Sequence, residues 1–389
     1  YKYVWGSGKM GNLTPWKQGG RYKKIFLKGE IIMRKLALLL GSLLVVASAS
    51  AKEVVPAPVV VEEAPVQVIE KEVIVYRDKE EGFRPNGYVD LQYRWYGETE
   101  NKTAAENDWA GATKYGRTQL MGKINMTENQ SFEYRIRNYG NVSNEKTGKT
   151  GTDTRLRYFY NHGNIGDSNV NFTSRIHYRD REDTTTGNQE LEYQARFNFA
   201  EYMFNNDYVK TTNFVIAPKY KYVWGSGNND DYDNRLGADL YTYFELPWGF
   251  SFEFNTYMDQ HFYGRDQAFN KLSDPKIKDK NFTIDVEAYI YNTQNLYTNG
   301  DVTVDFNFEG GYDPYTWSQY KKYGDNRDQK QNYELYALPT IQVNYQATPA
   351  LKLYAAAGAE YRNWEVTAKS DAKDWRWQPT VFAGFRATF

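Results

Sequence analysis

The chain has 389 residues, a formal net charge of −1 and no cysteine, which excludes disulfides and thiolate metal sites. Aromatic residues make up 17% of it, yet the mean hydropathy is −0.78, and no apolar run after residue 51 approaches the ~20 residues of a membrane-spanning helix. From Lys52 onward acidic residues outnumber basic ones, which argues against nucleic acid as a partner. An aromatic chain that is polar on average predicts β-structure with one apolar face and one wet face.

Residues 33–51 have the composition and order of a secretory signal peptide. A short basic start is followed by an apolar run over residues 36–46 and then by the small-x-small sequence Ala-Ser-Ala, which predicts a mature chain beginning at Lys52. The apolar run is too short to cross a membrane as a helix. The sequence therefore predicts an exported protein.

Two segments flank this predicted signal peptide. We interpret residues 1–32 as translated upstream sequence, because a signal peptide belongs at the start of a nascent chain; a genuine N-terminal extension is the alternative. The octapeptide YKYVWGSG, found at residues 1–8 and again at 220–227, is then no sign of a repeat architecture. Residues 52–83 are rich in Val, Glu and Pro, and repeated Pro blocks both helix and central strand, so we expect an extended periplasmic segment there.

From Arg84 onward apolar and polar residues alternate with a period of two, which is the pattern of half-buried β-strands. In DVTVDFNFE at residues 301–309, Val and Phe share one face while Asp, Thr, Asn and Glu share the other. Fourteen such segments lie near residues 87–97, 115–126, 131–140, 154–163, 170–179, 190–199, 209–224, 235–245, 250–258, 282–292, 299–309, 333–345, 350–363 and 376–389.

The connections between these segments alternate in length. On these boundaries the shortest connection of the long set, 180–189, exceeds the longest of the short set, 200–208. Two long connections, 259–281 and 310–332, are candidates for a loop that narrows a pore. Tight turns alternating with long loops are typical of a transmembrane barrel, in which a closed sheet pairs every backbone group within lipid. We predict an all-β, antiparallel transmembrane barrel of about fourteen strands over residues 84–389, with twelve or sixteen strands as alternatives.

The faces opposite the apolar ones carry charge, and its sign changes along the chain. In a closed barrel the basic third to seventh segments lie roughly opposite the acidic ninth to twelfth, so a basic wall faces an acidic wall and sets ion selectivity. A register error of one residue would turn a strand's charges outward, at a cost of about 2–4 kcal/mol for an Arg at the bilayer midplane. Replacing Arg155, Arg157 and Arg175 by Glu should shift selectivity toward cations. The basic side chains predicted to line the lumen are Arg94, Arg135, Arg137, Arg155, Arg157, Arg175, Arg179, Arg196, Lys219 and Lys221. The acidic ones are Glu253, Asp285, Glu287, Asp301, Asp305, Glu309 and Glu334.

Aromatic residues gather at the ends of the predicted strands, as an interfacial girdle requires. Trp95, Trp224 and Trp364 fall at the ends joined by long loops, and Trp248 falls at the opposite end. The last strand ends on Phe389, which alternation places on the apolar face. A terminal Phe of this kind is similar to the signal read by the barrel-assembly machinery, so we expect that machinery and outer-membrane lipid as partners.

Several stretches resemble one known family. MRKLALLLGSLL, VIVYRD, RPNGYVDLQYRWYGETEN and the terminal FRATF are similar to the fusobacterial major outer-membrane porin, and the resemblance covers residues 33–389. It implies a homotrimeric general-diffusion porin in the outer membrane of a Gram-negative cell, which passes ions and small hydrophilic solutes. It also implies a part in adhesion between bacteria. No cofactor is expected.

Two other functions are compatible with a barrel. The first is an enzyme, but none of the three His residues, His162, His177 and His261, has a Ser at an informative spacing or belongs to a His/Cys cluster, so we expect no catalytic residue and no metal site. The second is a surface adhesin that binds bacterial or host surfaces through long polar outer loops. An eight-stranded barrel is filled by its own side chains, whereas a wider one leaves a channel, which favours a pore with or without adhesion.

Overall fold

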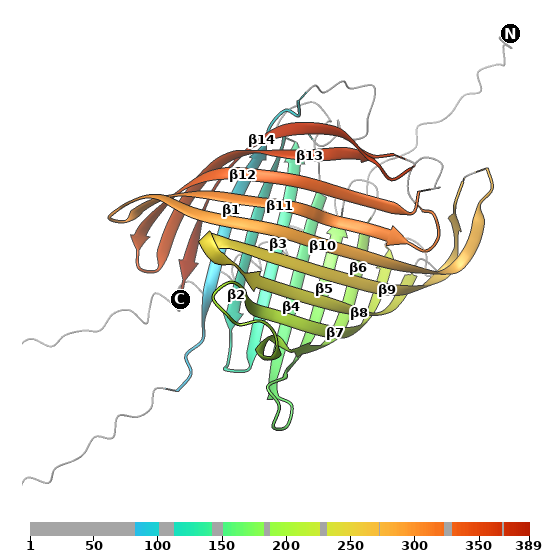
Figure 1. Ribbon diagram of the computed structural model, residues 1–389, viewed down its shortest axis with the longest axis horizontal. Helices are drawn as coiled ribbons and strands as arrows, with labels where there is room; N and C mark the ends of the chain where they lie inside the picture. Colours follow the sequence, from blue (N-terminus) through green and yellow to red (C-terminus); the bar gives the residue numbers. More distant parts are fainter. Residues whose placement is uncertain are drawn as a thin grey trace, which may run out of the picture. The chain divides into compact units, whose positions relative to one another are not determined.

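The computed structural model describes residues 82–389 except 101–112, 142–150, 183–186, 226–231, 272, 323–328 and 368. The predictions for residues 1–32, for the signal peptide at 33–51 and for nearly all of segment 52–83 therefore lie outside the described residues. The described chain forms a closed antiparallel barrel in which every strand pairs with its sequence neighbours and β1 pairs with β14 (Figure 1). This confirms the predicted all-β class and the strand number of fourteen.

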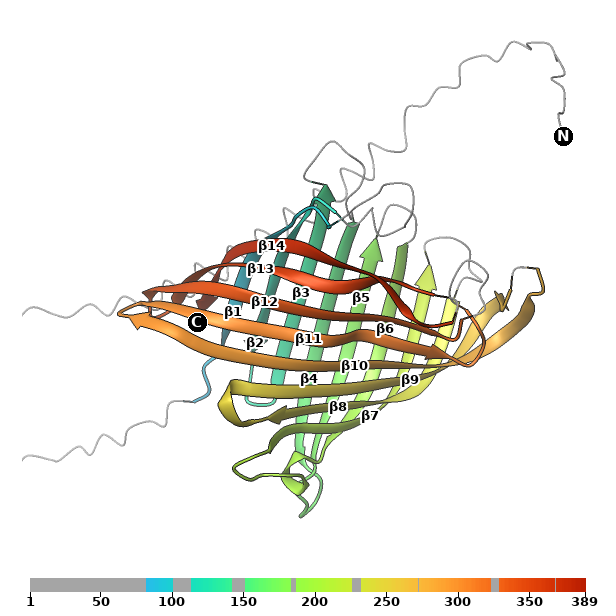
Figure 2. The same cartoon turned by 45° about the horizontal axis from the view of Figure 1, so that its top comes forward.

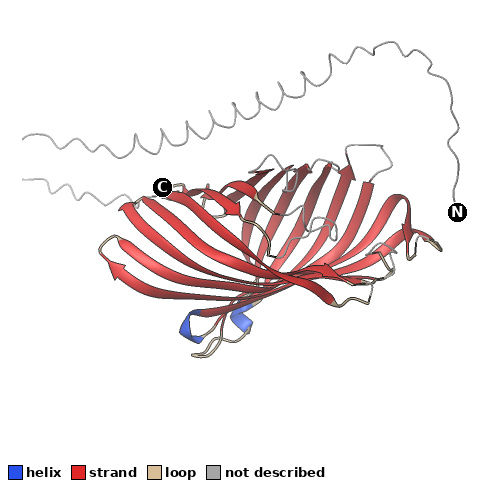
Figure 3. Ribbon diagram, turned by 90° about the horizontal axis from the view of Figure 1, so that it is seen from above, coloured by secondary structure: helices blue, strands red, loops and turns tan. Residues whose placement is uncertain are grey.

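Strands make up almost all of the regular structure. Two single-turn 3₁₀ helices, η2 (Ala200–Tyr202) and η3 (Pro247–Gly249), lie in connections at the same end of the barrel (Figure 3). Among the described residues, no helix has the length and hydropathy to cross a bilayer. The strands are β1 (Asn86–Tyr96), β2 (Tyr115–Asn125), β3 (Gln130–Asn141), β4 (Gly151–Asn164), β5 (Asn171–Glu182), β6 (Gly187–Asn198), β7 (Lys210–Gly225), β8 (Tyr232–Glu245), β9 (Phe250–Phe269), β10 (Lys276–Asn299), β11 (Val302–Ser318), β12 (Gln331–Thr348), β13 (Leu351–Val366) and β14 (Ala372–Thr388).

The barrel is closed by the pairing of its first and last strands. The register of β1 on β14 runs from Tyr88 opposite Thr388 to Tyr96 opposite Thr380. Beyond the last strand residue, the Phe389 N–H donates to the Gly87 carbonyl at 3.1 Å and the Gly87 N–H donates to the Phe389 carbonyl at 2.9 Å. The terminal residue thus completes the ladder, and no open sheet edge is left among the described strands for another chain to pair with.

The two faces of the barrel wall differ in polarity. On β12, Ile341 and Val343 point outward and are each 44% exposed, whereas Thr340 and Asn344 point inward and are buried. An apolar exterior around a polar interior is the inverse of a soluble protein and is what a lipid environment requires. Outward apolar residues with similar exposure recur around the barrel at Tyr93, Ile176, Leu191, Ile216, Leu236, Ile290, Val381 and Phe385.

The predicted lengths of several connections are wrong. Most of segment 259–281 is strand, because β9 runs to Phe269 and β10 begins at Lys276, and the two form a hairpin that projects beyond its neighbours (Figure 2). This segment is therefore wall rather than a loop across the pore. The strict alternation of lengths also fails, since the connection after β5 is 183–186 while the one after β6 is 199–209. Backbone pairing continues in water beyond the apolar belt, so hydropathy alone does not mark where a strand ends.

A β-bulge shapes β11 where it meets β10 and β12. The register shifts between Tyr312 and Tyr315 on one side and between Val286 and Ala288 on the other. Gly311 lies next to the bulge at φ +136°, and a Cβ there would stand 1.9 Å from the Ala288 carbonyl oxygen. Bulges often re-aim a side chain next to a functional site, and here Asp313 and Pro314 inside the bulge line a lumenal cavity.

Candidate functional site

The barrel encloses two adjoining cavities lined by its inward-facing side chains. The larger, of about 750 Å³, is lined by residues of β1–β3 and β11–β14. The smaller, of about 560 Å³, is lined by residues of β3–β11, and we call it the arginine cavity. Arg137 of β3 and Asp313 of β11 line both cavities, so a basic and an acidic side chain mark the border between them.

Three consecutive strands supply the basic side of the arginine cavity. Antiparallel pairing sets Arg135 of β3 directly opposite Arg155 of β4, and Arg155 directly opposite Arg179 of β5. We call these three residues the arginine row. Like charges directly opposite one another on neighbouring strands are destabilising, so the arginine row lowers the stability of the barrel at this place. The arginines that line this cavity from β3, β4 and β5 are Arg135, Arg137, Arg155, Arg157, Arg175, Arg179 and Arg181.

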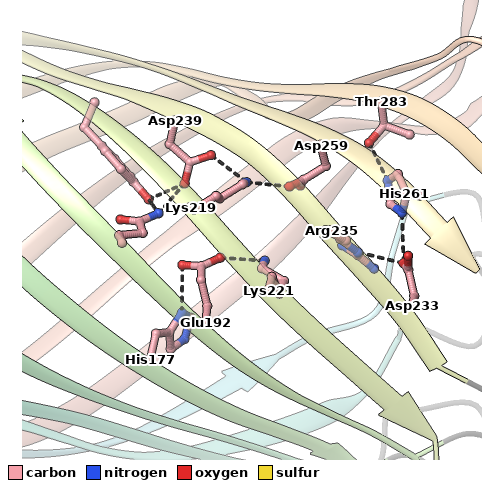
Figure 4. Close-up of polar contacts among 12 residues, drawn as sticks. His177, Glu192, Lys219, Lys221, Asp233, Arg235, Asp239, Asp259, His261 and Thr283 are labelled. Atoms are coloured by element: carbon pink, nitrogen blue, oxygen red, sulfur yellow. Dashed lines mark hydrogen bonds and ion pairs between the residues drawn. The ribbon is translucent and has the colours of Figure 1, made fainter.

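Two buried carboxylates offset part of this positive charge. Asp153 accepts hydrogen bonds from Arg135 Nη2 at 3.1 Å and from Arg179 Nε at 2.7 Å. Glu192 accepts one from Arg175 Nη2 at 2.6 Å and lies 3.1 Å from Lys221 Nζ; its link to Lys221 is drawn in Figure 4. Arg175 is only 4% exposed, so its ion pair with Glu192 is internal to the barrel wall.

The next strands, β7 to β9, join basic and acidic residues in close pairs. Lys219 Nζ lies 2.6 Å from Asp239 Oδ1 and 2.8 Å from Asp259 Oδ1, with all three side chains at most 5% exposed (Figure 4). Asp233 is shared in the same way by Arg235 Nε at 2.7 Å and by His261 Nδ1 at 2.8 Å. Arg235 offsets Asp233, whereas Lys219 offsets only one of its two carboxylates; both groups link neighbouring strands of the barrel wall.

Four acidic residues of β9 to β11 are held differently, by tyrosine hydroxyls. Tyr257 donates to Glu287 at 2.6 Å, and Tyr289 donates to Asp313 at 2.8 Å. Among the described residues neither acid has an ion pair. The same arrangement recurs at two further sites: Tyr291 donates to Glu253 at 3.0 Å, and Tyr336 donates to Glu309. A hydroxyl satisfies a carboxylate lone pair without neutralising its charge, so this wall keeps its negative charge.

Most of the predicted lumenal residues line one of the two cavities. The predicted residues that line the larger cavity are Arg94, Arg137, Glu309 and Glu334. Those that line the arginine cavity are Arg135, Arg137, Arg155, Arg157, Arg175, Arg179, Lys219, Lys221, Asp285 and Glu287.

Four predicted residues lie outside both linings. Arg196 donates to Gln194 and stacks on the Tyr241 ring, with its guanidinium carbon 4.3 Å from the ring centroid. Glu253 binds Tyr291 as described above, and Asp305 accepts from Asn344 at 2.7 Å. The placement of Asp301 on a strand face is wrong, because it lies exposed in the tight turn between β10 and β11. Phe389 is 42% exposed at the end of β14.

Several residues that organise the lumen were not expected from the sequence. Asp153 and Asp239 supply partners for the basic wall, and Tyr241 contacts Arg175, Gln194 and Asp239. The available signal was the same alternation, since Asp239 and Tyr241 are in phase with Arg235 along β8. Trp364 was expected in the outer girdle but lines the larger cavity, because it is in phase with the inward Arg362.

One histidine contacts a serine that the sequence spacing does not indicate. His162 Nε2 lies 2.9 Å from Ser174 Oγ on the outward face, and Ser174 lies 3.0 Å from the Tyr193 hydroxyl. A nucleophile–base pair needs a third group that orients the base, and within the described chain no side chain bonds Nδ1 of His162. Among the described residues there is also no group of three or more His, Asp or Glu arranged to hold a metal ion.

Comparisons with known proteins give distant structural likenesses. No protein-family model matches the sequence, and no curated protein matches it. The chain is similar to the outer-membrane channel DcaP of Acinetobacter baumannii, with a TM-score of 0.35 and 10% identity over 79% of this chain and 96% of that one. It is also similar to the NanC porin, with a TM-score of 0.31 and 12% identity over 76% and 98% of the two chains. A third likeness is to OmpT, an outer-membrane protein of Vibrio cholerae, in its trimer form, with a TM-score of 0.31 and 8% identity over 79% and 99%. The function of this chain is therefore inferred from its own residues.

Proposed function

We propose that the protein is an outer-membrane diffusion porin, which passes ions and small hydrophilic solutes through a water-filled lumen. The observation that carries the proposal is the division of the wall into an apolar outer face and a charged inner face that lines cavities of about 750 and 560 Å³. A wall of this kind is stable only where lipid meets one side and water meets the other.

The arrangement of charge supports a polar rather than an apolar solute. Arginines on β3–β5 and carboxylates on β10 and β11 line the same cavity, and in a closed fourteen-stranded barrel these strands lie roughly opposite one another. Fixed charges of opposite sign on opposite walls create a transverse field, which orients water and sets barriers that differ for cations and anions. An apolar solute would have to displace that oriented water, whereas a small polar solute keeps hydrogen bonds as it passes.

Further parts of the proposal come from the sequence. They are export by the signal peptide, a mature chain of residues 52–389, insertion through the barrel-assembly machinery with Phe389 as the terminal signal, and assembly as a homotrimer. The proposal includes no catalytic role and no cofactor. Adhesion through outer loops remains a second, sequence-based hypothesis, because much of the loop sequence falls in segments such as 101–112 and 142–150, outside the described residues.

The test is conductance of the purified protein in a planar lipid bilayer, with the reversal potential measured under a salt gradient. Discrete current steps that grow in proportion to bulk salt are expected from a wide aqueous pore. The sign of the reversal potential will show which wall dominates. A folded barrel that gives no steps would refute the pore and leave adhesion as the function to pursue.

A further inference from the structure

The arginine row has more positive charge than its described neighbours offset. Its three guanidinium groups, from Arg135, Arg155 and Arg179, lie on adjacent strands in direct register. Asp153 is the one described carboxylate that contacts the row, and it binds only the two outer members. Three positive charges against one negative charge leave a surplus of two.

The surplus lies at the centre of the row. Within the described chain, Arg155 makes no hydrogen bond or ion pair. Arg157, two residues further along the inner face of β4, also has none, and its Nε is buried without a partner. Both side chains line the arginine cavity. A buried polar donor without a partner costs free energy, so this part of the cavity lining has guanidinium donors and lacks an acceptor.

The chemistry of the missing acceptor follows from the number and geometry of these donors. Guanidinium groups bind phosphate through paired N–H donors that match two oxygens at once. A divalent oxyanion would cancel the surplus of two charges on the row itself, with Arg157 as a further donor, whereas chloride would cancel half of that surplus and accept without directional preference. Asp153 holds Arg135 and Arg179 by hydrogen bonds, so the two outer members of the row are ordered before any ligand arrives, which lowers the entropic cost of binding.

We propose that the arginine row, together with Arg157, is a binding site for the phosphate group of a small solute. The site rests on the proposed pore for access of the solute to the lumen, and it adds selective capture to simple diffusion. Because the site lies beside Arg137, which lines both cavities, a bound phosphate would lie close to the border between them.

The test measures binding without relying on current. The full-length protein in detergent is titrated by calorimetry at constant ionic strength, first with inorganic phosphate and then with glucose 6-phosphate. Saturable binding is expected, and Arg155→Gln should weaken it about tenfold through loss of charge-assisted donors. Binding of both probes assigns the site to phosphate esters as well, and binding of inorganic phosphate alone assigns it to the free ion.

The matched control is Arg117→Gln, which removes an arginine of the larger cavity that donates to Gln92. This variant should bind phosphate as the unmodified protein does. Should Arg155→Gln fail to give the circular dichroism of a folded barrel, Arg155→Lys replaces it, since lysine keeps the charge and loses the paired donors.

Three results would overturn the proposal: no saturable binding of either probe, equal weakening by the Arg117 and Arg155 variants, or equally tight binding of succinate. Bilayer conductance of the same preparation distinguishes rejection of the phosphate site from rejection of the proposed pore. A conducting protein that does not bind phosphate rejects the site alone, and a silent protein that binds it rejects the pore alone.

Discussion

Replacing Lys219 by methionine removes the cation that holds two buried carboxylates together. Its Nζ lies 2.6 Å from Asp239 and 2.8 Å from Asp259, and the Lys219 side chain is 1% exposed, so little solvent screens the three charges. After the change Asp239 keeps hydrogen bonds from Gln194 and from Tyr241 at 2.9 Å, whereas Asp259 keeps no side-chain hydrogen bond or ion pair within the described chain. Breaking a buried pair by removing one partner costs about 3–5 kcal/mol, and we expect a loss in this range.

The assay is urea unfolding of the barrel in lipid vesicles, followed by tryptophan fluorescence. The matched control is Lys210→Met, because Lys210 pairs with Glu245 at 3.3 Å while both side chains are more than half exposed, and such pairs contribute about 0–1 kcal/mol. If Asp259 carries the penalty, the double change Lys219→Met with Asp259→Asn should recover more than half of the loss. Equal losses in Lys219→Met and Lys210→Met, or no recovery in the double variant, would refute this reasoning.

Three further predictions concern the charge, the lipid face and the backbone of the barrel. Arg155→Glu combined with Arg157→Glu should move the reversal potential under a salt gradient toward cation selectivity, and an unchanged potential would mean that these residues do not meet the ions. Ile341→Arg should cost about 2–4 kcal/mol in urea unfolding because it faces lipid, while Gln342→Arg on the lumenal side should cost much less; equal losses would contradict the assigned faces. Gly311→Ala should cost about 1–3 kcal/mol, since φ is +136° and the added Cβ would meet the Ala288 carbonyl oxygen, and a neutral result in the same assay would contradict the backbone geometry of the β11 bulge.

The face on which a side chain lies could be predicted from the sequence, because a strand turns each successive residue to the other side. The alternation along β4 places Arg155 and Arg157 in the lumen, where they line a cavity. The alternation along β12 places Ile341 and Val343 on the outer face, where they are exposed. The same rule gave the fold class and the number of strands. It failed where alternation ends, as at Asp301, because a turn residue has no face to be assigned to.

The partners of those side chains could not be predicted, because they depend on the register between strands. Nothing within β4 indicates that Arg155 lies opposite two other arginines, or that Asp153 joins Arg135 to Arg179. For the same reason the sequence predicts that Arg175 is a pore-lining charge. Its bond to the buried Glu192 shows instead that it stabilises the barrel wall. A selectivity test in which Arg175 is also replaced would not distinguish a change of lumenal charge from loss of the folded barrel.

The effective field in the lumen is therefore set by fewer residues than a count of charges suggests. Arg175 pairs with Glu192 at 2.6 Å, and Lys219 pairs with Asp239 and Asp259 within 2.8 Å, so neither side chain acts as an isolated positive charge in the lumen. Glu287 and Asp313 are bound by tyrosine hydroxyls and keep their charge, and the centre of the arginine row keeps its charge for want of an acceptor. Because tyrosine binds a carboxylate without cancelling it, the acidic wall can be both ordered and negative. The basic wall has no equivalent neutral acceptor at Arg155 among the described residues, so this side chain is ordered by hydrogen bonds only when an acceptor from solution binds it.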